Sequence, residues 1–383
     1  MRKIKSLVLA AIGLLCSMSV SAEDFEVDGI YYNITSQADK TVAVTYRGDD
    51  YYDYSNEYSG EVKIPESVTY SGNTYSVTSI GENAFHGCWN LTSVELPNSV
   101  TSIGEHAFER CSSLTSVEIP NSVTSIGNEA FSECSSLTSV ELPNSVTSIG
   151  NEVFFYCTIL TSVEIGNSVT SIGESAFYGC SSLTSVEIGN SVTRIGGYAF
   201  CGCSSLTYVE LPNSVTSIDI SAFYGCSSLT SVELPNSVTS IGWSAFSECS
   251  SLTSVEIGNS VETIGWYAFS GCVNLKKLIS HAEVPPVCDS DVFGGVNTQE
   301  CTLQVPEKSI SAYQQADQWM EFFFIEGVPT AIGGVTVDGA VSATADVYST
   351  NGMLVKRNAD LKNLKHELPA GIYIIGGKKV YVR

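Results

Sequence analysis

Cysteine has the widest chemistry of the residues in this sequence, because thiols can form disulfides, bind zinc or act as nucleophiles. Nine of the 13 cysteines recur at intervals of 23 residues. This cysteine series consists of Cys88, Cys111, Cys134, Cys157, Cys180, Cys203, Cys226, Cys249 and Cys272. Zinc sites need ligands clustered at short spacings, which the series lacks. A thiol also packs well as a small apolar side chain, so we expect the series to be buried and unpaired.

Other cysteines break this spacing. Cys201 stands two residues before Cys203, so we expect its side chain to face the opposite way and to be exposed. Cys288 and Cys301 lie beyond the series, and they are the candidates for a disulfide if the chain is exported. Free thiols at both positions are the alternative.

The remaining titratable residues do not form a catalytic pattern. The four histidines lie in none of the motifs G-x-S-x-G, H-E-x-x-H or a phosphate-binding loop. Glycoside hydrolysis needs two carboxylates in unlike environments, whereas the glutamates of this chain repeat in like ones. We therefore expect no enzyme activity, no catalytic residue, no cofactor and no metal centre.

The interval of 23 residues extends well beyond the cysteines. A phenylalanine series starts at Phe85 and a leucine series at Leu91, both with the same step. A fixed period of this length indicates a solenoid, in which each coil contacts only its neighbours. Leu91, Val94 and Leu96 follow the L-x-x-L-x-L spacing of a leucine-rich repeat strand. We expect one parallel β-strand per coil, followed by a short helical or irregular return.

The outward residues of these strands are a serine and a glutamate, which stacking would align in two rows. We name them the acidic strip. Its members are Ser93, Glu95, Ser116, Glu118, Ser139, Glu141, Ser162, Glu164, Ser185, Glu187, Tyr208, Glu210, Ser231, Glu233, Ser254 and Glu256. Such a strip suits calcium ions, a basic protein segment or a second copy of the chain. The alternative is that the glutamates only keep the protein soluble and prevent sheets from associating.

A second candidate surface differs from coil to coil. The positions after the turn glycine and after the repeated phenylalanine hold aromatic residues that are typical of specific protein contacts. This variable edge consists of Phe155, Tyr156, Tyr178, Tyr198, Tyr224, Trp243, Trp266 and Tyr267. Partial burial of these rings against neighbouring coils is the alternative.

The sequence divides into five segments. Arg2, Lys3 and Lys5 precede an apolar run that is too short to span a membrane, and a small-residue site follows at Val20–Ala22. We therefore expect a signal peptide and export from the cell. The segments are a signal peptide (1–22), an N-terminal β cap (23–61), the solenoid (62–299), a C-terminal cap with a helix over Ser309–Trp319 (300–329) and a small all-β module (330–383).

The formal net charge of -23 limits the partners. A chain this acidic repels DNA, RNA and anionic lipid, so we expect no nucleic-acid partner. No segment after the expected signal peptide is long and apolar enough to cross a bilayer. The expected partners are extracellular proteins, glycans or other copies of the chain.

The repeat resembles the BspA-like (Treponema-type) leucine-rich repeat family over roughly residues 62–299. The family motif stands here as the segment Leu114–Pro120, followed by Val123, Ile126, Gly127, Ala130, Phe131 and Cys134. The resemblance implies a right-handed solenoid on a bacterial surface. It also implies adhesion to host proteins such as fibronectin or fibrinogen, or to other cells.

The C-terminal module is similar to type IX secretion sorting domains. The shared features are Val347-Tyr348, Asn351-Gly352, Gly371–Tyr373 and Lys379-Val380. The module is shorter than the usual domain and its first strands are not evident. The resemblance implies export across an outer membrane and later anchoring, whereas a β module without a sorting role is the alternative.

These observations predict a secreted or surface-displayed protein that binds macromolecules through a rigid solenoid. A structural or self-assembling surface component is the first alternative. A carbohydrate-binding module is the second, and it is disfavoured because the aromatic residues do not converge on one evident groove.

Overall fold

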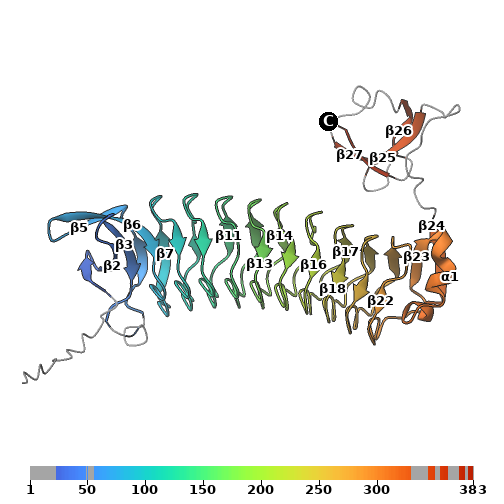
Figure 1. The fold of residues 1–383 in the computed structure, drawn as a ribbon, viewed down its shortest axis with the longest axis horizontal. Helices are drawn as coiled ribbons and strands as arrows, with labels where there is room; N and C mark the ends of the chain where they lie inside the picture. Colours follow the sequence, from blue (N-terminus) through green and yellow to red (C-terminus); the bar gives the residue numbers. More distant parts are fainter. Residues whose placement is uncertain are drawn as a thin grey trace, which may run out of the picture. The chain divides into compact units, whose positions relative to one another are not determined.

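The computed structural model describes residues 23–48, 50, 56–328, 344–349, 354–360, 371–375 and 378–382. The expected signal peptide, residues 1–22, lies outside the described residues. The chain forms two compact units, Met1–Val328 and Pro329–Arg383. The first unit is a row of stacked coils (Figure 1), so the predicted leucine-rich repeat solenoid is confirmed. In the described residues no helix has the length and apolar character needed to cross a membrane.

The first unit begins with antiparallel strands that run into the solenoid. Strand β1 (Phe25–Val27) pairs with β2 (Ile30–Ser36), and β2 pairs with β3 (Thr41–Thr45). Strand β3 then lies parallel to β6 (Asn73–Ile80), which also forms a hairpin with β5 (Ser67–Tyr70). The first coil is therefore covered by strands that continue its own ladder.

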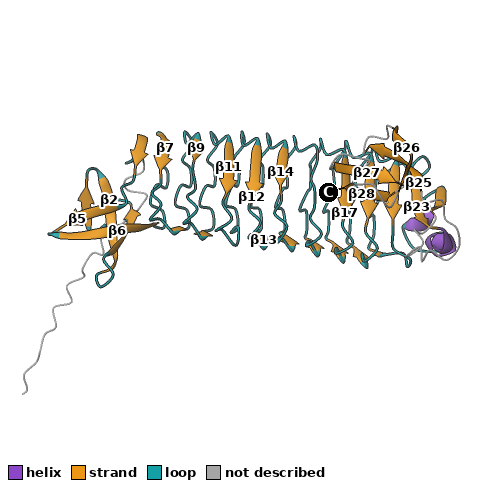
Figure 2. Ribbon diagram, turned by 90° about the horizontal axis from the view of Figure 1, so that it is seen from above, coloured by secondary structure: helices purple, strands orange, loops and turns teal. Residues whose placement is uncertain are grey.

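Most coils contribute short strands to two parallel ladders along the solenoid (Figure 2). Ile149 in the second ladder and Tyr208 in the first contribute only isolated bridges, and the first ladder is divided into three sheets. The first ladder contains β4 (Gly60–Lys63), β7 (Leu91–Glu95), β9 (Ser116–Val117), β11 (Ser139–Leu142), β12 (Ser162–Ile165), β14 (Ser185–Glu187), β17 (Ser231–Leu234), β19 (Ser254–Ile257), β21 (Lys277–Ser280), β23 (Thr302–Pro306) and β24 (Phe324–Val328). The second contains β6, β8 (Ser102–Ile103), β10 (Ser125–Ile126), β13 (Ser171–Ile172), β15 (Arg194–Ile195), β16 (Ser217–Ile218), β18 (Ser240–Ile241), β20 (Thr263–Ile264) and β22 (Val287–Cys288).

The return of each coil is a series of turns rather than a helix. It carries the repeated phenylalanines, whose rings form one buried stack from Phe85 to Phe293. Successive ring centroids lie 4.9–6.0 Å apart, with interplanar angles of 3–10°. Aromatic rings at this spacing attract one another beyond the area they bury. Tyr58 contacts the first ring at 4.6 Å, and Trp319 contacts the last at 5.3 Å with its plane turned by 61°.

The cysteine series lies beside this stack and is buried, as expected. From Cys111 to Cys272 each thiol donates a hydrogen bond to the carbonyl oxygen of the phenylalanine in the preceding coil, at 3.1–3.2 Å. Burial raises the pKa of every thiol in the series, to about 12 for Cys88 and Cys272. The thiols are therefore protonated at neutral pH and poor nucleophiles.

Two expectations about the other cysteines are wrong. Cys288 and Cys301 are both free thiols, so the structure does not contain the expected disulfide. Cys288 belongs to β22 in the second ladder, whereas Cys301 precedes β23 in the first ladder. The two cysteines therefore lie on different sides of the coil. Cys201 is buried rather than exposed. Burial raises the pKa of its thiol, and a hydrogen bond with Tyr178 lowers it in part.

The C-terminal end of the solenoid is closed by β23, β24 and three short helical turns. These are η1 (Glu307–Ser309), α1 (Ile310–Tyr313) and η2 (Trp319–Glu321). The helix expected over Ser309–Trp319 is therefore a single α-helical turn. The helix ends at Tyr313 and the chain continues in turns. Gln318, with φ 66°, precedes η2, in which Trp319 is buried. The Ser309 hydroxyl donates to the Glu283 carbonyl oxygen at 2.7 Å and does not cap α1.

The second unit contains a four-stranded antiparallel sheet in the order β26-β25-β27-β28. Its strands are β25 (Thr344–Ser349), β26 (Leu354–Asp360), β27 (Gly371–Ile375) and β28 (Lys378–Val382). The Asn351-Gly352 turn expected between β25 and β26 lies outside the described residues. The resemblance of the second unit to a sorting domain stays a prediction.

The phenylalanine stack generates a stability prediction. We expect Phe223→Ala to lower the free energy of unfolding by about 3–5 kcal/mol, because it removes a fully buried ring and leaves a cavity between two others. Tyr224→Ala, one residue later, removes a ring that is 40% exposed and should change stability by about 0.5 kcal/mol or less. Urea denaturation monitored by circular dichroism would compare the two. Equal losses would contradict the stacking account.

The buried thiols generate a second prediction. Iodoacetamide at pH 8 should leave the cysteine series unmodified in the native protein and alkylate it fully after unfolding in guanidinium chloride. Mass spectrometry of the unfolded protein without reductant should find Cys288 and Cys301 both alkylated. A peptide pair linked through these two cysteines would show that the disulfide forms after all.

Candidate functional site

The acidic strip lies on the outer face of the first ladder. Strand pairing places Glu141 beside Glu164 and Glu164 beside Glu187, and it places Glu233 beside Glu256. The aligned rows that the repeat predicts are therefore confirmed for these pairs. The strip glutamates are exposed except Glu256, which is half-buried. A binding role for the strip stays a prediction.

A basic side chain borders the glutamate row at each end. Lys63 is the register partner of Glu95, and its Nζ lies 2.6 Å from Glu95 Oε1. At the other end His281 Nε2 lies 2.6 Å from Glu256 Oε1. The hydrogen bond with Glu256 raises the pKa of His281, although burial alone would lower it. These contacts offset like-charge repulsion at the ends of the row but not along its middle.

The variable edge separates into two aromatic groups. In the first, the Phe155 ring stacks on Tyr178 at 5.1 Å and meets Tyr156 edge-on at 4.7 Å. In the second, Trp243 and Trp266 stack at 5.4 Å, and both are exposed, as is Tyr267. Tyr156 is exposed as well, whereas Phe155 and Tyr178 are half-buried, so partial burial holds for these two rings. A binding role for the variable edge stays a prediction. The other members are Tyr198, which is half-buried, and Tyr224, which is exposed; both belong to coils between the two groups.

A shallow open pocket lies beside the first aromatic group, with a volume of about 610 Å³. Its lining comes from the return turns of four consecutive coils. We name it the aromatic pocket, and it is lined by Trp89, Arg110, Ser112, Glu133, Ser135, Phe155, Tyr156 and Thr158. Trp89 is 47% exposed and Tyr156 is 45% exposed. Trp89, Phe155 and Tyr156 thus line one groove, whereas the other aromatic residues of the variable edge lie outside its lining. A carbohydrate-binding role stays a prediction.

Sequence analysis missed Trp89 and the serines of the pocket floor. The position after each cysteine of the series is a serine in most coils, including Ser112 and Ser135, and Trp89 departs from this rule. That departure from the serine pattern is a sequence signal that could have identified Trp89 as a surface residue of interest. Trp89 and Tyr156 lie three coils apart in the sequence. Only the stacking of the coils brings the two residues to one groove, so the sequence alone does not show their common pocket.

Three pocket residues have an unusual backbone. Each coil has a left-handed position two residues after its phenylalanine, and glycine occupies it at Gly87, Gly179, Gly202, Gly225, Gly271 and Gly295. In three consecutive coils the same position holds Arg110, Glu133 and Tyr156, with φ of 61°, 57° and 53°. Side chains larger than glycine are disfavoured in this conformation. The Arg110 guanidinium lies 3.4 Å from the Glu133 carboxylate, so these two side chains form an ion pair in the pocket.

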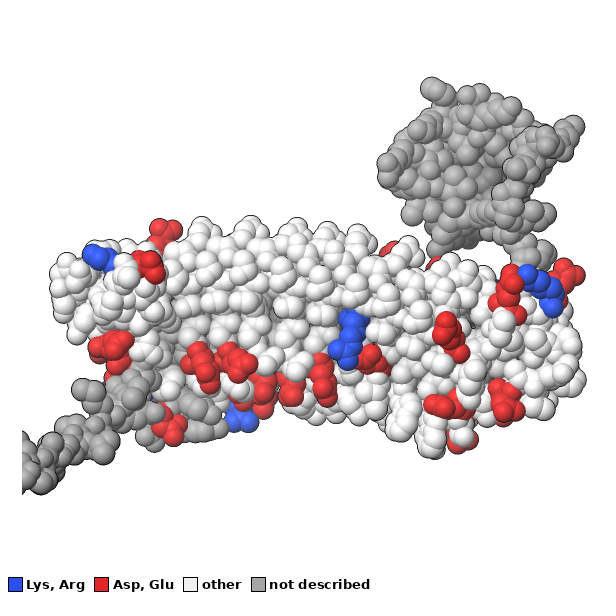
Figure 3. Space-filling model, viewed as in Figure 1, with Lys and Arg blue, Asp and Glu red and all other residues white. Residues whose placement is uncertain are grey.

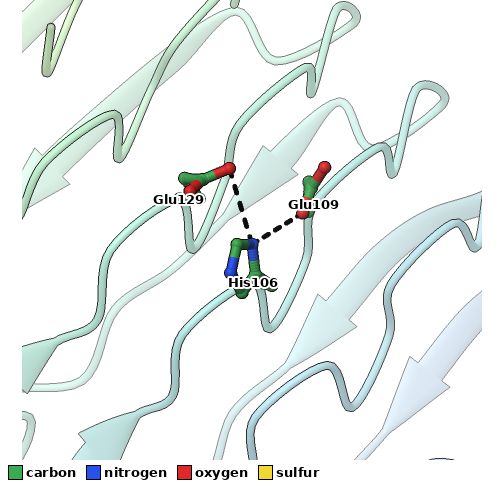
Figure 4. Close-up of side chains that lie close together, drawn as sticks. All are labelled: His106, Glu109 and Glu129. Carbon is green, nitrogen blue, oxygen red and sulfur yellow. Dashed lines mark hydrogen bonds and ion pairs between the residues drawn. The ribbon is translucent and has the colours of Figure 1, made fainter.

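Acidic side chains also gather along one long edge of the solenoid, on a face that otherwise carries few charges (Figure 3). Among the described residues, the only group of three possible metal ligands within 4.8 Å of one another is His106, Glu109 and Glu129. Figure 4 shows His106 between the two carboxylates. The carboxylates of the acidic strip form no such group in the described part of the chain.

Comparison with known proteins gave matches to structures and to one family model. A leucine-rich cell surface protein from Faecalibacterium prausnitzii A2-165 is 26% identical, with a TM-score of 0.44, and the match covers 83% of this chain and 98% of that one. A leucine-rich repeat protein from Bacteroides ovatus ATCC 8483 is also 26% identical, with a TM-score of 0.40, over 80% of this chain and 100% of that one. The T. pallidum leucine-rich repeat protein is 28% identical, with a TM-score of 0.41, over 60% and 90%.

A search of curated proteins found no match. The family model for the BspA type leucine rich repeat region matches residues 67–184 and 170–299, with six copies. These residues make up more than half of the sequence and contain the stacked coils described above. The chain therefore belongs to the BspA-type leucine-rich repeat family.

Proposed function

We propose that this chain is a secreted or surface-displayed bacterial adhesin that binds an extracellular protein through the aromatic pocket. Export is supported by the basic and apolar pattern of residues 1–22. Binding is supported by membership of a leucine-rich repeat family, whose stacked coils form extended recognition surfaces. The candidate partners are matrix proteins, plasma proteins and the surfaces of other cells.

One observation carries the proposal. Arg110, Glu133 and Tyr156 occupy left-handed positions where six other coils have glycine, and all three line the aromatic pocket. A non-glycine residue in this conformation costs of order 1–3 kcal/mol, and such costs are characteristic of functional sites. A fourth residue, Glu248, holds the same position with φ 61° but lies outside the pocket lining.

The chemistry of the pocket suits a protein partner. Exposed tryptophan, tyrosine and arginine are the residues that most often dominate protein interfaces. Coils stack at about 4.8 Å, so Trp89 and Tyr156 stand about 14 Å apart along the solenoid. Four residues of an extended peptide span about this length. The Arg110–Glu133 pair between the two rings offers both a donor and an acceptor to such a segment.

A glycan is the second candidate, and a specific observation favours it. Trp89 and Tyr156 border a floor that includes the hydroxyl groups of Ser112 and Ser135. Aromatic rings next to hydroxyl and charged groups can contact the apolar face of a sugar while bonding its hydroxyls. Self-association is the remaining alternative. The exposed stack of Trp243 and Trp266 is the feature that would support it.

The acidic strip is proposed as a separate site for cations. Its glutamates repeat in register without a basic residue between Glu95 and Glu256 in their own row. Like charges at about 4.8 Å repel by roughly 0.8 kcal/mol per pair in water, less with salt. A bound divalent cation would relieve this repulsion.

The pocket proposal predicts a separation of binding from stability. We expect Arg110→Gly, Glu133→Gly and Tyr156→Gly together to keep the protein folded, with a free energy of unfolding no lower than that of the wild type, because glycine removes the cost of three left-handed residues. The same variant should lose binding at least tenfold. The measurement is solid-phase binding of the full chain to immobilised fibronectin, fibrinogen and a glycan panel.

Glu248→Gly is the matched control, because it makes the same exchange outside the pocket and should bind like the wild type. Binding to a protein supports the first candidate, and binding to glycans alone supports the second. Self-association in analytical ultracentrifugation without any ligand would support the structural alternative. A triple variant that binds as well as the wild type would refute the pocket.

The acidic strip predicts a response to calcium. We expect millimolar calcium to raise the melting temperature of the wild type above that in sodium chloride of equal ionic strength. Glu141→Gln, Glu164→Gln and Glu187→Gln together should abolish this rise, because they remove the central carboxylates. Differential scanning calorimetry measures both. A wild type that does not respond to calcium would leave the strip as a solubility feature.

A further inference from the structure

A histidine and two glutamates meet at the junction of two coils, close to the aromatic pocket but outside its lining. His106 and Glu109 belong to one coil and stand three residues apart. Glu129 occupies the position of His106 in the next coil. His106 Nδ1 lies 2.7 Å from Glu109 Oε2 and 3.5 Å from Glu129 Oε2 (Figure 4).

The backbone holds these three side chains in fixed positions. The His106 N–H donates to the Asn128 carbonyl oxygen at 3.0 Å, and the Glu129 N–H donates to that of Asn151 at 2.9 Å. The Glu109 N–H donates to the His106 carbonyl oxygen at 3.1 Å. The first two bonds join successive coils and the third closes a turn within one coil, so the backbone of all three residues is held in place before any ion binds.

The spacing of the three ligand atoms suits a tetrahedral metal ion. Ligands about 2.1 Å from zinc at tetrahedral angles lie about 3.4 Å from one another. The separation of His106 Nδ1 and Glu129 Oε2 already has this value. Glu109 Oε2 would move away from His106 by only about 0.7 Å, which its side chain can do by rotation.

A buried histidine supports one of the two carboxylates. His86 comes from the preceding coil and is only 7% exposed, and its Nε2 lies 3.7 Å from Glu109 Oε2. The imidazole of His86 therefore lies beside the proposed ligand oxygen of Glu109 on its buried side. Buried polar residues next to a ligand orient it in many metal sites.

Negative charge exceeds positive charge around the group. The carboxylates of Glu109 and Glu129 both lie next to His106 Nδ1. Arg110 is the basic side chain that contacts the group, with its Nε 3.6 Å from Glu109 Oε1. A cation between Glu109 and Glu129 would therefore be attracted by these two carboxylates.

We propose that His106, Glu109 and Glu129 bind a divalent transition-metal ion of the zinc type. An imidazole nitrogen favours zinc, nickel or cobalt over calcium, which prefers ligands that are all oxygen. Three protein ligands leave one coordination position for water or for a side chain of a partner. The site is independent of the pocket, and either proposal can fail without the other.

Isothermal titration calorimetry of the full chain with zinc chloride tests the site. His106→Asn and Glu129→Gln should each weaken zinc binding by at least about tenfold. Asparagine is chosen because it tolerates the left-handed backbone of residue 106, where φ is 53°. Glu152→Gln is the matched control. It lies at the position of Glu129 one coil further on and should change the affinity by less than threefold.

Cobalt(II) gives a second measurement that does not depend on affinity. The wild type should show the absorption of tetrahedral cobalt without a thiolate charge-transfer band, and both ligand variants should lose it. Circular dichroism would establish that the variants are folded. Absence of zinc binding in the wild type, or equal binding in the wild type and both ligand variants, would overturn the proposal, as would a thiolate band.

Discussion

The solenoid depends on each coil finding a copy of itself above and below. The Phe85–Phe293 stack is the clearest case, because every inner ring has both faces covered by the rings of its two neighbours. The cysteine thiols depend on the same alignment, since each donates to a carbonyl of the preceding coil. Adjacent coils approach so closely at Gly127 that no side chain fits there, because a Cβ atom would meet the Glu105 backbone nitrogen at 2.5 Å. The stack ends where Tyr58 and Trp319 supply rings of another kind.

The same alignment determines what the surface can do. A side chain copied in every coil forms a row, as the strip glutamates do, and a row cannot distinguish one place along the solenoid from another. Specific recognition therefore needs departures from the repeat. Arg110, Glu133 and Tyr156 are such departures, at a backbone position where most coils have glycine. Trp89 is another, in a series of serines.

The group of His106, Glu109 and Glu129 also depends on departures from the repeat. His106 and Glu129 occupy equivalent positions in adjacent coils, and both have a left-handed backbone. Stacking brings two different side chains to neighbouring places, so an arrangement of unlike ligands arises from a scaffold of like coils. His86, from a third coil, holds the carboxylate of Glu109 from the buried side.

The sequence by itself determined the coil, the strand positions, the buried cysteine series and the alignment of the strip, because each depends on a period that is visible in one dimension. Tertiary structure decided the features that depend on unlike neighbours. It brought Trp89 and Tyr156 to one pocket from coils 67 residues apart in sequence. It buried Cys201 and left Cys288 and Cys301 unpaired. It also limited the closing helix to Ile310–Tyr313, since the chain after Tyr313 continues in turns that bring Trp319 against the last ring.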